Sequence, residues 1–216
     1  SGNNNDWTSN NLTESDISVD SPTNNFATLN PLDSRSTVLA EGNLQNTPSG
    51  SNHWGTARST FAMPSGSWYA EFYCKAGTGN GNNFAGIATQ SEPLTGISDS
   101  STPLGFSSTS WGYSDNDNIY NNGSIINSTG TTWVTGDIIG VTFTGTVLKF
   151  YKNNSLIATV SNIPVNDYCF TTNSWTTSMS MIANFGQDSS FAGNKTAQGN
   201  QDSNNIGDFY YTPPTG

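Results

Sequence analysis

The chain has 216 residues, of which 10% are charged and 32% are hydrophobic, and it is rich in Asn, Ser, Thr and Gly. This composition excludes a helical bundle or coiled coil and disfavours a doubly wound nucleotide-binding domain, because residues that favour helices are scarce. Six Lys and Arg stand against sixteen Asp and Glu, giving a net charge of -10, so we expect neither nucleic acid nor an anionic membrane as a partner.

The first part of the chain, residues 1–55, is irregular. Residues 1–26 are polar, with Trp7 as an anchor candidate, and two turn-forming clusters at 30–33 and 48–50 flank a weak strand at 37–40. We expect this part to form an N-terminal arm and edge strands that pack on a sandwich formed by residues 56–216, so that the whole chain is a single domain.

From residue 56 onward the pattern is that of β-strands. Residues 56–63 and 67–75 alternate between apolar and polar side chains, and the segment 64–66 between them is a turn. A period of two residues over such a length predicts antiparallel strands with one buried face. The residues predicted to face inward are Ala57, Phe61, Met63, Trp68, Ala70, Phe72 and Cys74, while Arg58 faces outward.

The middle of the chain predicts a buried strand at 84–89, a loop at 90–110 and a new strand that starts at 111–113. A polar loop at 114–118 leads to Ile119 and Tyr120, and the pair Asn122-Gly123 then predicts a hairpin that returns over 124–127.

The pattern of the last part predicts strands at 137–144, 146–152, 155–161, 168–171 and 178–185, a long polar loop at 186–207 and a terminal strand at 209–211. Long loops in compact domains are usually functional or disordered. The residues predicted to face inward are Leu148, Phe150, Leu156, Ala158, Val160, Met179, Met181, Ala183 and Phe185. Ten or eleven short strands without a helix predict an all-β fold, a β-sandwich of two antiparallel sheets whose core is filled by aromatic rings.

Residues 67–185 resemble the SPRY family, whose fold is a concanavalin A-like jelly roll. The resemblance lies in phrases that occur in the family's order: SWYAEF at 67–72, AGIA at 85–88, GY at 112–113, IYNNG at 119–123, DIIGV at 137–141, LKFYKN at 148–153 and ANFG at 183–186. Asn154 stands where the family often has Gly, and a type I′ turn tolerates Asn there.

The flanking segments 21–32 and 209–214 resemble those around SPRY-like domains in tailed-phage structural proteins. That resemblance implies an extracellular location on a virion, as a tail fibre, baseplate or capsid appendage, with other virion proteins as neighbours. A homo-oligomer is left open.

In the SPRY family, loops at one end of the sandwich bind the partner. Rings and amides gather together in such loops here, and this pairing suits a glycan, whose C–H faces stack on rings and whose hydroxyls bond to amides. We therefore predict that the segment 111–122 recognises a host-surface glycan or protein. Its candidate residues are Trp111, Tyr113, Asp115, Asn116, Asp117, Asn118, Tyr120 and Asn121, with Trp54, Trp133 and Trp175 as further rim rings.

A purely structural virion protein and a glycan hydrolase are the alternatives. Hydrolysis needs two carboxylates roughly 5–10 Å apart, and Glu71 stands alone on its strand. His53 is the only histidine and belongs to no catalytic motif, so we predict a non-catalytic protein without a resident cofactor. Asp115 and Asp117 could together bind Ca²⁺, or they could lie in a solvated turn. Cys74 and Cys169 either pair or remain separate buried thiols.

Overall fold

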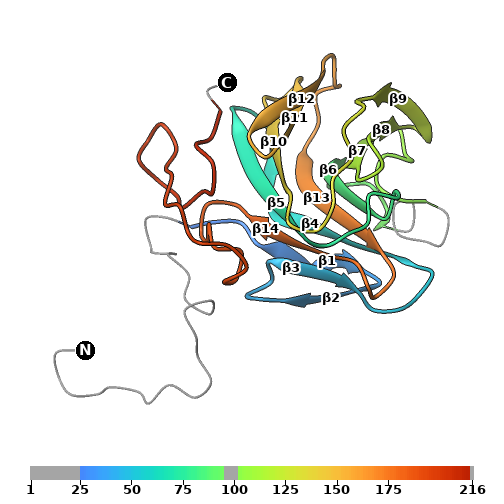
Figure 1. The fold of residues 1–216 in the computed structure, drawn as a ribbon. Helices are drawn as coiled ribbons and strands as arrows, with labels where there is room; N and C mark the ends of the chain where they lie inside the picture. Colours follow the sequence, from blue (N-terminus) through green and yellow to red (C-terminus); the bar gives the residue numbers. More distant parts are fainter. Residues whose placement is uncertain (1–24, 95–101, 215–216) are drawn as a thin grey trace.

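A computed structural model describes residues 25–94 and 102–214, which form fourteen β-strands and no α-helix (Figure 1). One sheet contains, in spatial order, β1 (Leu29–Arg35), β4 (Trp54–Met63), β13 (Tyr168–Trp175), β6 (Asn83–Thr89), β7 (Ser110–Ser114), β8 (Asn118–Asn121) and β9 (Ser124–Ser128). The other contains β12 (Ser155–Val160), β11 (Leu148–Lys152), β10 (Ile138–Phe143), β5 (Trp68–Ala76), β14 (Ser180–Asn184), β3 (Gln45–Pro48) and β2 (Thr37–Ala40). The predicted two-sheet antiparallel sandwich is confirmed.

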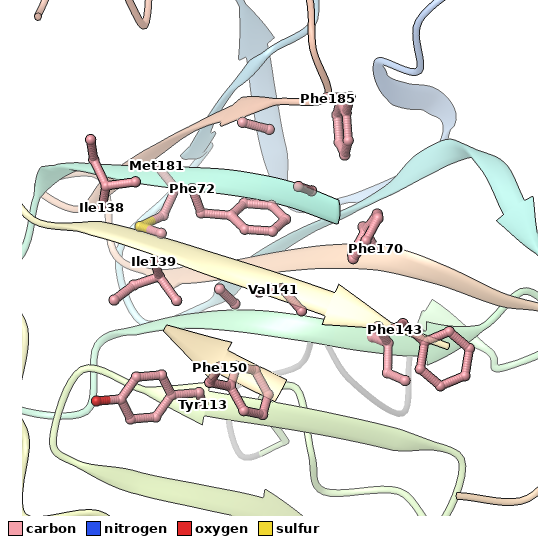
Figure 2. Packing of buried hydrophobic residues seen from close by; sticks show 14 of the residues in the cluster. Phe72, Tyr113, Ile138, Ile139, Val141, Phe143, Phe150, Phe170, Met181 and Phe185 are labelled. Carbon is pink, nitrogen blue, oxygen red and sulfur yellow. The ribbon is translucent and has the colours of Figure 1, made fainter. Parts of the chain in front are cut away.

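Aromatic rings join the two sheets. Tyr113 on β7 lies 5.5 Å from Phe150 on β11, and Phe72 on β5 lies 6.4 Å from Phe170 on β13, measured between ring centroids. Figure 2 shows these rings among the aliphatic side chains of β10. The core of this chain with few aliphatic residues is therefore built largely from rings, as its composition predicts.

One strand lies where the sequence predicts a turn. The cluster at 30–33 falls inside β1, but the pairing of β1 with β4 shifts register between Leu29 and Ser34, so these residues form an irregularity in an edge strand. At the other predicted turn, Pro48 is the last residue of β3 and the chain then bends at Ser49 and Gly50, as predicted.

The predicted terminal strand at 209–211 is wrong. Only Phe209 forms a β-bridge, with Asn200, because the amides of Tyr210 and Tyr211 donate hydrogen bonds to the carboxylate of Glu71 instead of to a neighbouring strand.

Two predicted side-chain directions are also wrong. Leu156 is 55% exposed, because β11 and β12 shift register next to Phe150 and so turn Leu156 to the outer face. Phe61 is 36% exposed, and a similar register shift between β4 and β13 lies beside it. Arg58 lies on the side of β4 opposite to the core residue Ala57, as predicted, but it is buried there because its guanidinium group binds Asp33 and the carbonyls of Thr89 and Glu92.

The long loop at 186–207 covers part of the outer face of the second sheet, at Tyr73 of β5. Phe191 is fully buried and stacks on Tyr73 with ring centroids 5.4 Å apart, and Lys195 Nζ lies 5.4 Å from the centre of the Tyr73 ring. The role of the loop in the fold is therefore structural.

The N-terminal part contributes the edge strand β1 to the first sheet, and the edge strand β2 with its neighbour β3 to the second. The predicted arm up to residue 24, including Trp7, lies outside the described residues. Residues 25–94 and 102–214 contain no helix that is long and apolar enough to span a lipid bilayer.

Candidate functional site

The outer face of the first sheet carries a second, smaller hydrophobic cluster. Phe84 and Ala88 of β6 belong to it together with Trp54 and Leu104, whereas Ala85 and Ile87 belong to the main core. This division follows from the alternation of side chains along a strand. The segment that precedes β7 can lie flat on the sheet because Gly112 faces it: a Cβ there would be 2.7 Å from the carbonyl oxygen of Leu104.

A pocket opens beside this cluster. Its volume of about 340 Å³ is within the usual range of ligand sites. It is lined by rings, amides and small residues from β4, β6, β8, β13 and three loops. The lining residues are Trp54, Asn80, Gly81, Asn82, Phe84, Pro103, Phe106, Asn116, Tyr120 and Trp175. None of these side chains carries a formal charge.

The five rings form a continuous chain along the pocket. Successive ring centroids are 5.1 Å apart for Trp175 and Trp54, 5.3 Å for Trp54 and Phe84, 5.7 Å for Phe84 and Tyr120, and 5.6 Å for Tyr120 and Phe106. Each ring is thus held by its neighbours, so the pocket presents a preformed apolar surface.

Several polar groups of the pocket have no partner within the described part of the chain. These groups are the indole N–H of Trp54, the indole N–H of Trp175, the hydroxyl of Tyr120 and the amide nitrogen of Asn116. The amide oxygen of Asn116 accepts hydrogen bonds from the backbone N–H and the side chain of Asn118 at 3.3 Å each. A ligand that can accept hydrogen bonds would complement these free donors.

Two comparisons found no relative: no family model matches the chain, and no curated protein is similar to it in sequence. The comparison with solved structures agrees with the sandwich architecture described above. Among solved structures, the SPRY domain of human HERC1 is similar with a TM-score of 0.61 and 17% identity, over 72% of this chain and 96% of that one. A human SPRY domain has a TM-score of 0.57 and 16% identity, over 69% and 95%. The TRIM65 PSpry domain has a TM-score of 0.57 and 16% identity, over 74% and 89%.

The fold is that of a SPRY domain. At these identities the similarity concerns the fold, and the site of this SPRY-like chain has to be argued from its own residues.

Three of the predicted rim rings do not belong to the pocket. Trp111, Tyr113 and Trp133 are buried in the main core, where the Tyr113 hydroxyl donates a hydrogen bond to the carbonyl of Thr131. Burial raises the pKa of Tyr113 to about 12. Their interpretation as rim residues is therefore wrong, because β7 and the segment after β9 turn these rings inward.

Asp115 positions one wall of the pocket. It is fully buried, and its Oδ1 accepts hydrogen bonds from the backbone N–H groups of Gly81 at 2.5 Å and Asn82 at 2.8 Å. Desolvation raises the pKa of its carboxyl group against the opposing effect of these hydrogen bonds. Asp115 is thus a positioning residue that holds the segment 80–82 in place.

Asn121 supports the opposite wall. Its amide nitrogen donates hydrogen bonds to the carbonyls of Ser107, Ser108 and Ser110, the closest at 2.9 Å. It therefore fixes the segment that follows Phe106, and like Asp115 it acts on the pocket through the backbone.

The structure does not bring Asp115 and Asp117 together as a cation site. Both oxygens of Asp115 accept hydrogen bonds from the chain, including one at 3.4 Å from the Asn83 amide. Asp117 is half-buried in the turn with a φ of 82°. No group of three or more His, Cys, Asp or Glu that could hold a metal occurs within residues 25–94 and 102–214.

The pocket thus contains Asn116 and Tyr120 of the predicted segment, together with the predicted rings Trp54 and Trp175. Sequence reasoning missed Asn80, Asn82, Phe84, Pro103 and Phe106. Phe84 looked like a core residue because β6 is apolar on both faces, and Phe106 lies in a segment without any strand pattern. The Gly- and Asn-rich composition of 77–83 was the available signal for the missed amides.

Proposed function

We propose that this SPRY-like chain is a non-catalytic binding module whose pocket holds an uncharged saccharide unit of a host-surface glycan. The observation that carries this proposal is the composition of the pocket, in which five mutually packed rings lie beside three amides and no charged side chain.

The chemistry of a sugar matches both parts of this lining. The rings offer apolar surface for the C–H faces of a pyranose, and the free indole, hydroxyl and amide donors can bond to its hydroxyl and ring oxygens. Glycoside hydrolysis would need a pair of carboxyl groups at the bond that is cleaved, and the lining residues of this pocket supply none. The composition therefore suits binding better than cleavage.

We further propose that the module belongs to a tailed-phage virion, such as a tail fibre, baseplate or capsid appendage. Support comes from the resemblance of 209–214 and of 21–32 to phage structural proteins, although residues 21–24 lie outside the described part.

The experiment is a glycan array probed with the whole chain, followed by titration of the best neutral oligosaccharide. Phe106→Ala and Trp175→Ala each remove a ring from the pocket and should weaken binding about tenfold or more, which corresponds to about 1.4 kcal/mol. Phe61→Ala is the matched control, because Phe61 is also partly exposed but lies on β4 away from the pocket lining. It should leave the affinity unchanged.

The other functions give different results in the same experiment. Release of reducing sugar from a bound oligosaccharide would show a hydrolase. Absence of binding to every glycan and to host-cell surface proteins would favour a structural or decoration role. Equal loss of binding in Phe61→Ala and in the pocket variants would refute this pocket as the binding site.

A further inference from the structure

A second hollow of about 710 Å³ lies on the outer face of the other sheet. Its floor is formed by side chains of β5, β10 and β11, and its walls by the turn at 65–67, the loop at 201–206 and the C-terminal segment 209–214. In Figure 1 the C-terminal segment, in red, lies on the side of β5 away from the first sheet. We call this hollow the C-terminal groove.

The register of three strands fixes the floor of the C-terminal groove. Thr142 on β10 pairs with Tyr69 on one side and with Lys149 on the other, so these three side chains lie in one row. In the next row, Gly140 lies between Glu71 and Tyr151. A Cβ on Gly140 would be 3.0 Å from the Tyr69 hydroxyl and 3.4 Å from Cβ of Tyr151, so its absence leaves room for both tyrosines.

The walls are held in place by hydrogen bonds and ring contacts. Tyr210 and Tyr211 donate their backbone N–H groups to Glu71, and the ring of Phe209 lies 5.4 Å from that of Tyr69. On the other wall, Oδ1 of Asp202 accepts hydrogen bonds from the N–H groups of Asn204 and Ile206. The groove is therefore preformed.

Lys149 is the feature of the groove that points to a charged ligand. It is half-buried, and its ammonium group has no hydrogen-bond or ion-pair partner within the described residues. Four of the five other cations of this acidic chain are engaged, and the fifth, Arg35, is exposed to solvent. Arg58 pairs with Asp33, Lys152 with Asp137, Lys195 packs over the rings of Tyr73 and Tyr210, and Lys75 bonds to Gln45.

The carboxylates near the groove do not form an ion pair with the ammonium group of Lys149. Glu71 is fully buried and accepts four hydrogen bonds, from Tyr69, Asn184, Tyr210 and Tyr211. Asp202 caps its own loop and makes no ion pair with Lys149. A ligand anion at Lys149 would provide the missing partner.

We propose that the C-terminal groove is a second binding site, for a saccharide that carries a carboxylate. Lys149 would bind the carboxylate, Tyr69 and Tyr151 would supply apolar surface to the sugar ring, and Thr142 and the amides of the 201–206 loop would bond to its hydroxyls. The proposal is independent of the neutral-sugar pocket, because the two hollows share no lining residue.

The experiment titrates the whole chain with a disaccharide of galacturonic acid and with its methyl ester, in about 0.15 M salt to screen the net charge. The acid should bind saturably, and the ester should bind about tenfold more weakly because a hydrogen bond to a charged group is lost. Lys149→Met keeps the aliphatic stem and should weaken binding of the acid by a similar factor.

Two control variants test whether the acid binds at Lys149 in the groove and not elsewhere on the chain. Arg35→Gln removes an exposed cation outside the groove and should leave the affinity for the acid unchanged. Phe106→Ala, in the other pocket, should also leave it unchanged. Equal binding of acid and ester, retention of affinity in Lys149→Met with a native thermal unfolding transition, or loss of affinity in Phe106→Ala would each overturn the proposal.

Discussion

Glu71 ties the end of the chain to the second sheet. Its Oε1 accepts hydrogen bonds from the Tyr211 N–H at 2.8 Å and the Tyr69 hydroxyl at 3.1 Å, and its Oε2 from the Tyr210 N–H at 2.9 Å and the Asn184 amide at 3.0 Å. Desolvation nevertheless raises the pKa of its carboxyl group. The sequence showed only a strand acid flanked by tyrosines, because most of its partners lie more than 100 residues away.

Glu71→Gln should release the C-terminal segment. The amide keeps the volume but turns an N–H₂ group toward donors, which should lower the free energy of unfolding by about 2 kcal/mol. Limited proteolysis should then cut within 209–214 faster than in the wild type. Glu41→Gln is the matched control, since Glu41 makes no side-chain hydrogen bond in the described chain.

Comparison of the wild type with Glu71→Gln also tests the raised pKa of Glu71. A carboxyl group whose pKa is raised by folding contributes stability below its ordinary pKa of about 4.3, and this contribution is lost as the pH rises through the folded value. Denaturant unfolding should therefore show wild-type stability falling over this range more steeply than that of Glu71→Gln. Parallel pH profiles for the two proteins would contradict the raised pKa.

At the scale of the element, a register shift decides which face of β12 is buried. Alternation predicted Leu156 to face inward, but the shift between β11 and β12 pairs Leu156 with Tyr151 on the outer face. Ala158, two residues further along, still pairs with Phe150 and remains buried. Periodicity cannot reveal such a shift, because it arises from the pairing of two strands.

Leu156→Ala and Leu148→Ala should consequently differ in their effect on stability. Leu148 is fully buried, so its truncation should cost about 3 kcal/mol in the free energy of unfolding. Leu156 is more than half exposed, so the same truncation should cost less than about 0.5 kcal/mol. Comparable losses in chemical denaturation would mean that Leu156 is buried and that the register shift is absent.

At the scale of the whole molecule, the two cysteines report on the integrity of the sandwich. Cys74 and Cys169 are free and buried, on β5 and β13, whereas the sequence leaves pairing and separate burial both open. Desolvation raises the pKa of Cys74 to about 12 and that of Cys169 to about 11, so both remain thiols at neutral pH.

An aromatic disulfide reagent should therefore find no reactive thiol in the native protein and two in denaturant. The denaturant dependence of this reaction should follow the loss of tertiary structure, because both thiols become accessible only when the sheets open. Rapid reaction of either thiol under native conditions would contradict the burial of Cys74 and Cys169. Detection of fewer than two thiols in denaturant without a reducing agent would contradict their being unpaired.

The sequence by itself determined the fold class, most strand positions and the ring-filled core, because the period of two and the turn residues are local signals. It also identified four residues of the pocket, Trp54, Asn116, Tyr120 and Trp175. Only the tertiary structure decided which rings point outward, that Asp115 and Asn121 hold the walls, and that Lys149 stands without a partner among the described residues of the groove. These features depend on strand register and on contacts between distant segments, which no local pattern contains.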